Sequence, residues 1–117
     1  MELPAKSWDS GKGDWTPNCD FSVSKTGITV LIELAGLKSD DLDITVHGNR
    51  LQIEGNRLRP EASRVDGQAS GEVKFGRFHV ILEFPAGHDV TQSKAFYSNG
   101  FLRIDVPAAE GGGRVVF

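Results

Sequence analysis

The sequence has one cysteine and no long hydrophobic run, and both shortages exclude classes of protein. A single thiol, Cys19, cannot form a disulfide within the chain and fits a reducing cytosol. We expect it to be a small, half-buried residue just before a strand. No stretch approaches the roughly 18 apolar residues of a membrane-spanning helix, and the first residues lack the apolar core of a secretory signal. The sequence therefore predicts a cytoplasmic protein without integral membrane contact.

A concentrated positive charge is also missing. The 13 lysines and arginines are mixed with 16 aspartates and glutamates, which gives a formal net charge of −3. Proteins that bind phosphate backbones need clustered basic side chains, so nucleic acid is not an expected partner. The length of 117 residues, of which 38% are hydrophobic, suits one folded domain.

The usual patterns of catalytic and metal-binding residues are absent as well. His47, His79 and His88 lie far apart, and none accompanies a serine or cysteine elbow. We expect these histidines at the surface or at strand ends. One cysteine and three scattered histidines give no zinc-ligand spacing, and the acidic residues 40–43 lack the length and final glutamate of an EF-hand loop. The sequence predicts neither an enzyme nor a metal or cofactor site.

What the sequence does contain is a repeated alternation of apolar and polar residues. It is clearest from Ile28 to Leu34, where every second residue is a large aliphatic, as in a half-buried strand. The residues expected to face the core, run by run, are Phe21 and Val23; Ile28, Val30, Ile32 and Leu34; Leu42, Ile44 and Val46; Leu51 and Ile53; Phe78, Val80, Leu82 and Phe84; and Leu102, Ile104 and Val106. Many short strands of this kind predict an all-β, antiparallel sandwich.

Turn residues separate these runs. Glycine or asparagine recurs between them, and Gly48-Asn49 and Asn99-Gly100 are good signals of hairpins. No run of ten or more residues keeps a helical period. We therefore expect at most one helical turn, near residues 39–42, with Ser39 as its N-cap.

Two parts of the chain do not follow the strand pattern. Residues 56–71 are polar, charged and long for a loop, and they are either a disordered connector or an arm that orders on a partner. The ends differ too: the first residues carry Trp8 and Trp15, and three glycines precede the apolar tail at residues 114–117.

Four motifs in order resemble those of a known family. Residues 95–102 match the signature A-x-x-x-N-G-x-L of the α-crystallin domain, and residues 34–37 with 40–46 resemble its "D-L-P-G-V … D-I-x-V-x-V". Residues 51–57 are similar to "L-x-I-x-G-x-R", and residues 76–85 to "G-x-F … L-P". From about Trp15 to Pro107 the chain thus resembles the small heat-shock proteins.

This resemblance implies an immunoglobulin-like sandwich that forms homodimers or larger homo-oligomers and holds non-native proteins without ATP. It divides the chain into a short N-terminal arm (1–14), an α-crystallin domain (15–107) and a C-terminal extension with a tail motif (108–117). In bacterial, plant and archaeal members, the loop at the position of residues 56–71 carries an extra strand that pairs with the neighbouring subunit. An exposed sheet edge gives that pairing a physical reason.

The resemblance also implies a docking groove for the tail. The family's I-x-I/V motif corresponds in spacing to Val115 and Phe117, which would be the tail anchors, although a frayed tail is the alternative. The residues expected to wall the groove are Leu42, Ile44, Val46, Lys94 and Phe96. Trp8 and Trp15 are candidate contacts for client proteins, unless they pack against their own sandwich.

Two other functions compete with a holdase. One is a p23-like co-chaperone or adaptor that binds a folded partner through a sheet face, and the tail and the A-x-x-x-N-G-x-L motif argue against it. The other is a carbohydrate-binding module, which needs a platform of exposed aromatic residues. Only Phe96, Tyr97 and Phe101 cluster, at a hairpin where we expect packing to explain them.

Overall fold

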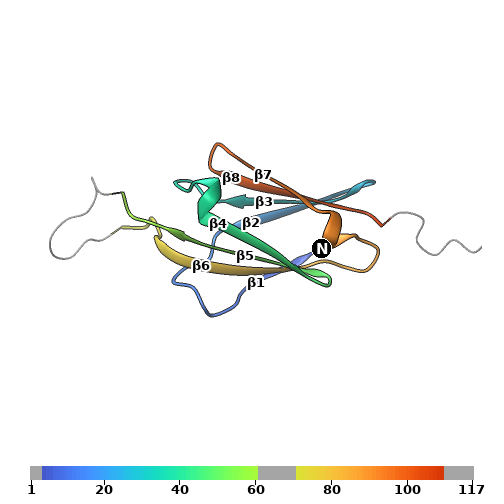
Figure 1. Cartoon of the computed structure of the whole chain (residues 1–117), viewed down its shortest axis with the longest axis horizontal. Helices are drawn as coiled ribbons and strands as arrows, with labels where there is room; N and C mark the ends of the chain where they lie inside the picture. The colour runs from blue at the N-terminus through green and yellow to red at the C-terminus, as the bar shows by residue number, and fades with distance from the viewer. Residues whose placement is uncertain (1–3, 61–70, 110–117) are drawn as a thin grey trace, which may run out of the picture.

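Two antiparallel sheets form the regular structure of the computed structural model, which describes residues 4–60 and 71–109 (Figure 1). The first sheet has the order β1 (Lys6–Asp9), β6 (Gly76–Glu83), β5 (Arg50–Arg57), β4 (Leu42–His47). The second has the order β2 (Cys19–Ser24), β3 (Gly27–Glu33), β8 (Phe101–Pro107), β7 (Lys94–Ser98). The sheets pack face to face, so the predicted all-β sandwich is confirmed.

The core between the sheets follows from the alternation in the sequence. Ile28, Val30 and Ile32 of β3 are buried and pair with Val106, Ile104 and Leu102 of β8, so that apolar residues meet across neighbouring strands. Burying one such side chain contributes about 1.5–3 kcal/mol. All residues predicted to face inward in β3, β5, β6 and β8 are buried.

The predicted hairpins are present. Asn99 and Gly100, between β7 and β8, have φ angles of 53° and 81°, which fits the type I′ turn favoured by two-residue hairpins. Gly48, with φ of 61°, begins the turn between β4 and β5. These tight turns fix the register that places the apolar residues of each pair on one face.

The helical turns differ from the prediction in two respects. The 3-10 turn η1 (Ser39–Asp41) lies where a turn was expected, but its N-cap is Lys38, not Ser39. The Asp41 carboxylate accepts a hydrogen bond from the Lys38 main-chain N–H at 3.1 Å and so stabilises that start. A second turn, η3 (Val90–Gln92), was not predicted, because one turn of 3-10 helix leaves no periodic pattern in a sequence.

The N-terminal segment belongs to the sandwich, which contradicts the predicted boundary at residue 15. Strand β1 pairs with β6, with Lys6 opposite Glu83 and Asp9 opposite Val80, and Ala5 is buried in the core. Strand β1 was missed because its four residues include only one large apolar side chain.

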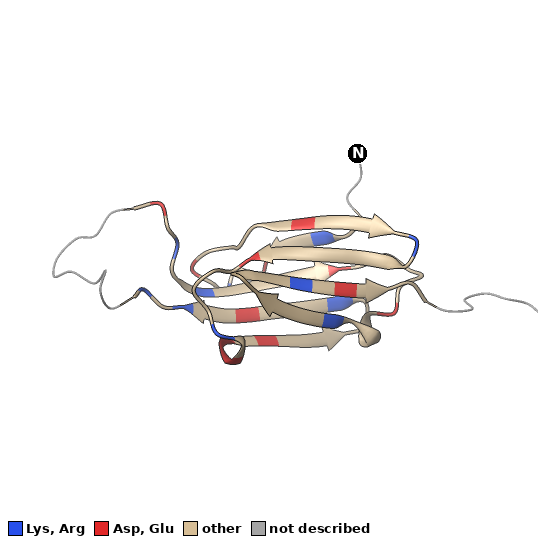
Figure 2. Ribbon diagram, turned by 90° about the horizontal axis from the view of Figure 1, so that it is seen from above, with Lys and Arg blue, Asp and Glu red and all other residues tan. Residues whose placement is uncertain are grey.

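Two further side chains lie differently from the prediction. Val23, expected to face the core, is 67% exposed, because it lies near the end of the edge strand β2. His79, expected at the surface, is buried in the middle of β6. Figure 2 shows that basic and acidic residues are dispersed over both sheets, in agreement with the mixed charge of the sequence.

Candidate functional site

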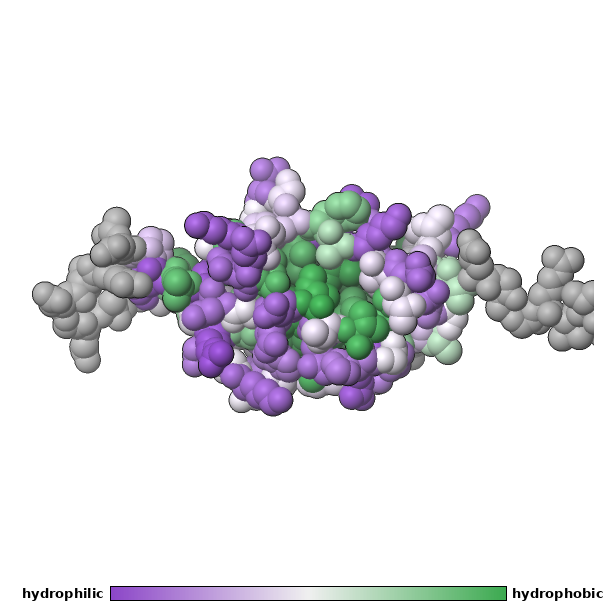
Figure 3. Space-filling model, in the orientation of Figure 1, coloured by the Kyte–Doolittle hydropathy of each residue, from purple (hydrophilic) through white to green (hydrophobic). Residues whose placement is uncertain are grey.

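One side of the sandwich is formed by the two edge strands β4 and β7. Each is the last strand of its own sheet, and both views place them at the same edge (Figures 1 and 2). On β4, Leu42, Ile44 and Val46 point between the sheets, but Leu42 and Ile44 are only half-buried and Val46 is 41% exposed. Figure 3 shows apolar surface in the middle of this face, between polar margins.

The β7 side of this edge is formed by Ala95 and Tyr97. They pair with Ile104 and Leu102, which face the core, so their side chains point inward as well. We call the inward-facing residues of the two strands the β4–β7 edge. Its members are Leu42, Ile44, Val46, Ala95 and Tyr97.

The prediction that Lys94 and Phe96 wall the groove is wrong. Lys94 pairs with Asp105 and Phe96 with Arg103, and these pairs lie on the outer face of the sheet. The Arg103 guanidinium lies 5.5 Å from the centre of the Phe96 ring, which is 51% exposed. Apolar residues occur on both faces of β7, so the alternation alone did not show which face points inward.

Phe101 is also partly exposed on that outer face. The expectation that packing accounts for the whole aromatic cluster of this hairpin therefore holds for Tyr97 alone.

The loop at residues 34–38 closes one end of the β4–β7 edge. The Tyr97 hydroxyl donates a hydrogen bond to the Leu34 carbonyl and accepts one from the Leu37 N–H at 3.3 Å. Beyond this contact, the main-chain groups on the outer sides of β4 and β7 have no neighbouring strand in the described structure. An unpaired edge beside an apolar surface can accept an extended segment of another chain.

The predicted tail anchors, Val115 and Phe117, lie outside the described residues. Their docking on the β4–β7 edge therefore stays a prediction.

The two tryptophans have different environments. Trp15 is only 7% exposed: its indole N–H donates to the Gly76 carbonyl at 2.9 Å, and its ring meets Phe78 edge to face at 5.3 Å. It packs against its own sandwich, which was the alternative to a contact with client proteins. Trp8 lies on the outer face of β1, partly buried, with the Arg50 guanidinium 5.2 Å from the ring centre. Its predicted role remains untested.

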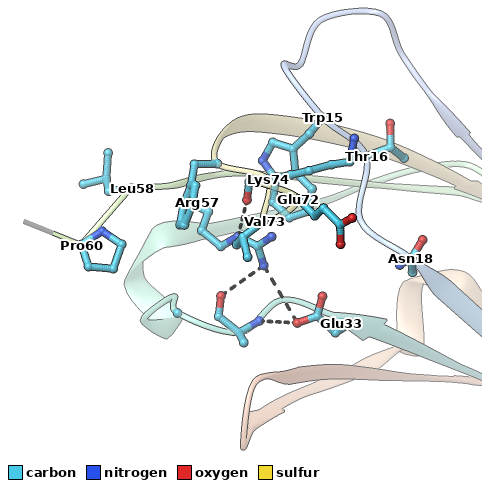
Figure 4. A pocket seen from close by; sticks show the side chains of 13 residues that line it. Trp15, Thr16, Asn18, Glu33, Arg57, Leu58, Pro60, Glu72, Val73 and Lys74 are labelled. Atoms are coloured by element: carbon cyan, nitrogen blue, oxygen red, sulfur yellow. Dashed lines mark hydrogen bonds and ion pairs between the residues drawn. The ribbon is translucent and has the colours of Figure 1, made fainter. Parts of the chain in front are cut away.

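A cavity of about 490 Å³ lies where the polar connection between β5 and β6 begins and ends (Figure 4). Its lining residues come from the N-terminal segment, the 34–38 loop and both ends of the connection. They include Trp15, Glu33, Ala35, Arg57, Leu58 and Phe75.

Arg57 is the central residue of this cavity. It is buried, and its guanidinium lies 4.0 Å from the centre of the Trp15 ring. Its Nε donates to the Lys74 carbonyl at 2.8 Å and its Nη1 to the Ala35 carbonyl at 3.3 Å. Glu33 Oε1 lies 3.9 Å from the same Nη1. The sequence held a signal for this burial, because Arg57 follows Leu51 and Ile53 at the spacing of inward-facing residues.

Outside these sites, the fold shifts the pKa values of Cys19 and of the Arg103–Asp105 pair. Burial, with a smaller contribution from Asp20, raises the pKa of the Cys19 thiol to about 11. A hydrogen bond from Arg103 lowers the pKa of Asp105, and a hydrogen bond from Thr29 acts in the same direction.

The described residues show no arrangement for metal binding or membrane crossing. Within residues 4–60 and 71–109, no three histidine, cysteine or acidic side chains are grouped so that they could hold a metal ion. In the same residues, no helix has the length and apolar character needed to cross a bilayer.

The β7–β8 hairpin, which carries the A-x-x-x-N-G-x-L motif, and the order of strands in the two sheets point to one family. The sequence model of the Hsp20/alpha crystallin family matches residues 20–114 of the chain. The chain belongs to this family. It is thus a small heat-shock protein with an α-crystallin domain, and family and fold together give it a chaperone role.

Relatives by sequence agree with this assignment. The chain is 30% identical over 100 residues to heat shock protein 16 of Schizosaccharomyces pombe. The aligned region covers 84% of this chain and 70% of that protein. It is 27% identical over 96 residues to small heat shock protein C2 of Rickettsia felis, and this alignment covers 82% of the chain and 62% of that protein.

Solved structures resemble the fold closely. Heat shock protein 16.0 of Schizosaccharomyces pombe superposes with a TM-score of 0.76 at 26% identity, over 93% of this chain and 79% of that one. A small heat-shock protein of Xylella fastidiosa, described as having a distinct high order structure, gives a TM-score of 0.75 at 24% identity, over 88% and 95% of the two chains.

Proposed function

We propose that this chain is an ATP-independent holdase that binds non-native proteins and prevents their aggregation. The observation that carries the proposal is the β4–β7 edge, where apolar side chains are partly exposed beside two strands with unpaired outer sides. An unfolding protein exposes what such an edge accepts, namely extended main chain with apolar side chains.

The size of the edge suits weak and reversible holding. Each 100 Å² of apolar surface that a client covers contributes only about 2.5 kcal/mol, before the cost of ordering the bound segment. A contact of this strength retains an aggregating chain and later releases it without nucleotide hydrolysis. Several edges in one oligomer would raise the retention of one client through multivalency.

Self-association is part of the proposal. Residues 56 and 57 of the predicted connection 56–71 lie in β5, and the polar residues that follow them would pair with a neighbouring subunit. The tail anchors Val115 and Phe117 would dock on the β4–β7 edge of another copy. Support comes from the Xylella fastidiosa relative, which is described as having a high order structure. Clients and tails would then compete for the same edge.

The first test is light scattering of a heat- or reductant-destabilised protein, without ATP, at increasing ratios of this chain. Size-exclusion chromatography with light scattering gives the mass of the same sample. Suppressed aggregation by a dimer or larger species supports the holdase. If aggregation is not suppressed and the chain is monomeric, the holdase is rejected in favour of an adaptor that binds a folded partner.

A pair of variants on β4 tests whether the edge carries the activity. V46K places a lysine on the β4–β7 edge, whereas T45K places a lysine at an exposed position on the other face of the same strand. We expect V46K to lose most of the suppression and T45K to retain it. Equal suppression by both variants would show that clients bind elsewhere.

A further inference from the structure

The 34–38 loop is held from two sides. On one side, the Tyr97 hydroxyl of the β4–β7 edge bonds to Leu34 and Leu37. On the other side, the Arg57 guanidinium bonds to the carbonyl of Ala35, the residue next to Leu34. Two neighbouring carbonyls of one short loop therefore accept hydrogen bonds from two different parts of the molecule.

Arg57 also holds the chain where it enters β6. Its Nε bonds to the Lys74 carbonyl, and its stacking partner Trp15 bonds to the carbonyl of Gly76, two residues further on. The Arg57 guanidinium lies 5.8 Å from the centre of the Phe75 ring as well. The end of the β5–β6 connection and the 34–38 loop thus share one buried side chain (Figure 4).

We propose that Arg57 is a positioning residue that couples the β5–β6 connection to the β4–β7 edge. A change in residues 72–76 moves the Arg57 fork, which then loosens or fixes the 34–38 loop and, through Tyr97, the end of the edge. The biological use of this coupling rests on the proposed function. Pairing of the connection with a partner subunit would regulate how well the edge binds a client or a tail.

An arginine is required for this role. Its planar fork donates from Nε and Nη1 to two carbonyls on different segments while its face lies against an aromatic ring. A lysine keeps the charge but has a single ammonium group that cannot reproduce this geometry. R57K therefore removes the coupling with little change in volume or charge.

The test is amide hydrogen exchange of the full chain, comparing R57K with the parent. We expect the Leu37 amide, which Arg57 does not contact, to exchange about tenfold faster in R57K relative to the amides of β3 and β8, which report global opening. R50K is the matched control, since Arg50 lies on the same strand, pairs with Glu83 at 3.6 Å and stacks on Trp8. It should leave the Leu37 amide unchanged.

Either of two results would overturn the coupling: faster exchange confined to residues 74–76, or the same factor at every amide. If R57K does not fold, W15F replaces it, because it keeps an aromatic face for Arg57 but removes the bond to the Gly76 carbonyl. We expect a smaller acceleration of the Leu37 amide in W15F, and none would reject the proposal. Hydrogen exchange is measured without a client. The coupling can therefore be tested even if the holdase assay fails.

Discussion

At the scale of single residues, the Cys19 thiol is the group most altered by the fold. It begins the edge strand β2 and is half-buried, with Asp20 beside it. Both features disfavour the thiolate and raise its pKa to about 11. Because the thiolate is the reactive form, the fold protects this residue from oxidation and disulfide exchange near neutral pH.

We therefore predict that Cys19 reacts about tenfold more slowly with a disulfide reagent at pH 8 in the native protein than in urea, since a large loss of thiolate is partly offset by its greater nucleophilicity. The release of the coloured thiol is followed over time in both states. Equal rates would show that the thiol is exposed and unperturbed.

Asp105 illustrates a shift in the opposite direction. The hydrogen bond from Arg103 lowers its pKa, so its contribution to stability is present above the pKa of the unfolded carboxyl and is lost as the pH falls through the lower folded value. R103Q should raise the pKa of Asp105, measured by NMR titration of its carboxyl carbon. R50Q, which removes an arginine from the other sheet, should leave this pKa unchanged.

Gly27 and Gly48 show how much a glycine's surroundings matter. Both have positive φ, but a Cβ at Gly27 would lie 2.0 Å from the Val106 carbonyl oxygen, whereas a Cβ at Gly48 would meet nothing within 4 Å. We predict that G27A lowers the free energy of unfolding by about 3 kcal/mol and G48A by about 1 kcal/mol. Urea unfolding of the two variants measures both values, and similar losses would contradict the clash.

At the scale of elements, alternation was a reliable guide wherever one face of a strand is fully buried. Strand β3 shows this best, because Ile28, Val30 and Ile32 all face the core and the residues between them do not. Edge strands are harder to predict. In β7 both faces carry apolar side chains, so the parity that places Tyr97 inward and Phe96 outward depends on pairing with β8, which a local pattern does not contain.

The cavity residues show a second limit of sequence reasoning. Arg57 and Trp15 are 42 positions apart, and their stacking depends on how the N-terminal segment crosses the end of β5 and β6. The spacing of β5 indicated that Arg57 faces inward, but it gave no information about what it would meet. The family resemblance likewise pointed to the edge strand β4 without giving the contacts of its side chains.

Strand β1 yields a prediction at this scale. Removal of residues 1–9 deletes the partners of four β6 residues, together with the buried Ala5. At about 0.5–1.5 kcal/mol for each lost hydrogen bond, and about one bond for each of the four pairs, we expect a loss of about 2–6 kcal/mol of unfolding free energy. Calorimetry measures the loss, and hydrogen exchange should show β6 opening first. Unchanged stability would mean that β1 adds nothing to the sandwich and is dispensable for folding.

At the scale of the whole molecule, the two long sides of the sandwich differ. Strands β1 and β2 form one side, where Trp15 and the N-terminal segment cover the core. Strands β4 and β7 form the other, where Val46 and its neighbours remain partly exposed. Exposed apolar surface beside strands whose outer sides lack a neighbour invites association, so the open side is where assembly and client binding would converge.

The last prediction tests that convergence. If the tail docks on the β4–β7 edge of another copy, deletion of residues 114–117 should reduce any larger oligomer to dimers, because the contact between dimers is lost. In an extended tail Val115 and Phe117 point to the same side and Val116 to the opposite side. V115D should therefore reproduce the deletion, whereas V116D should assemble normally. Size-exclusion chromatography with light scattering gives the masses. An unchanged mass after deletion would reject docking, and an equal effect of V115D and V116D would show that charge, not a seated side chain, controls assembly.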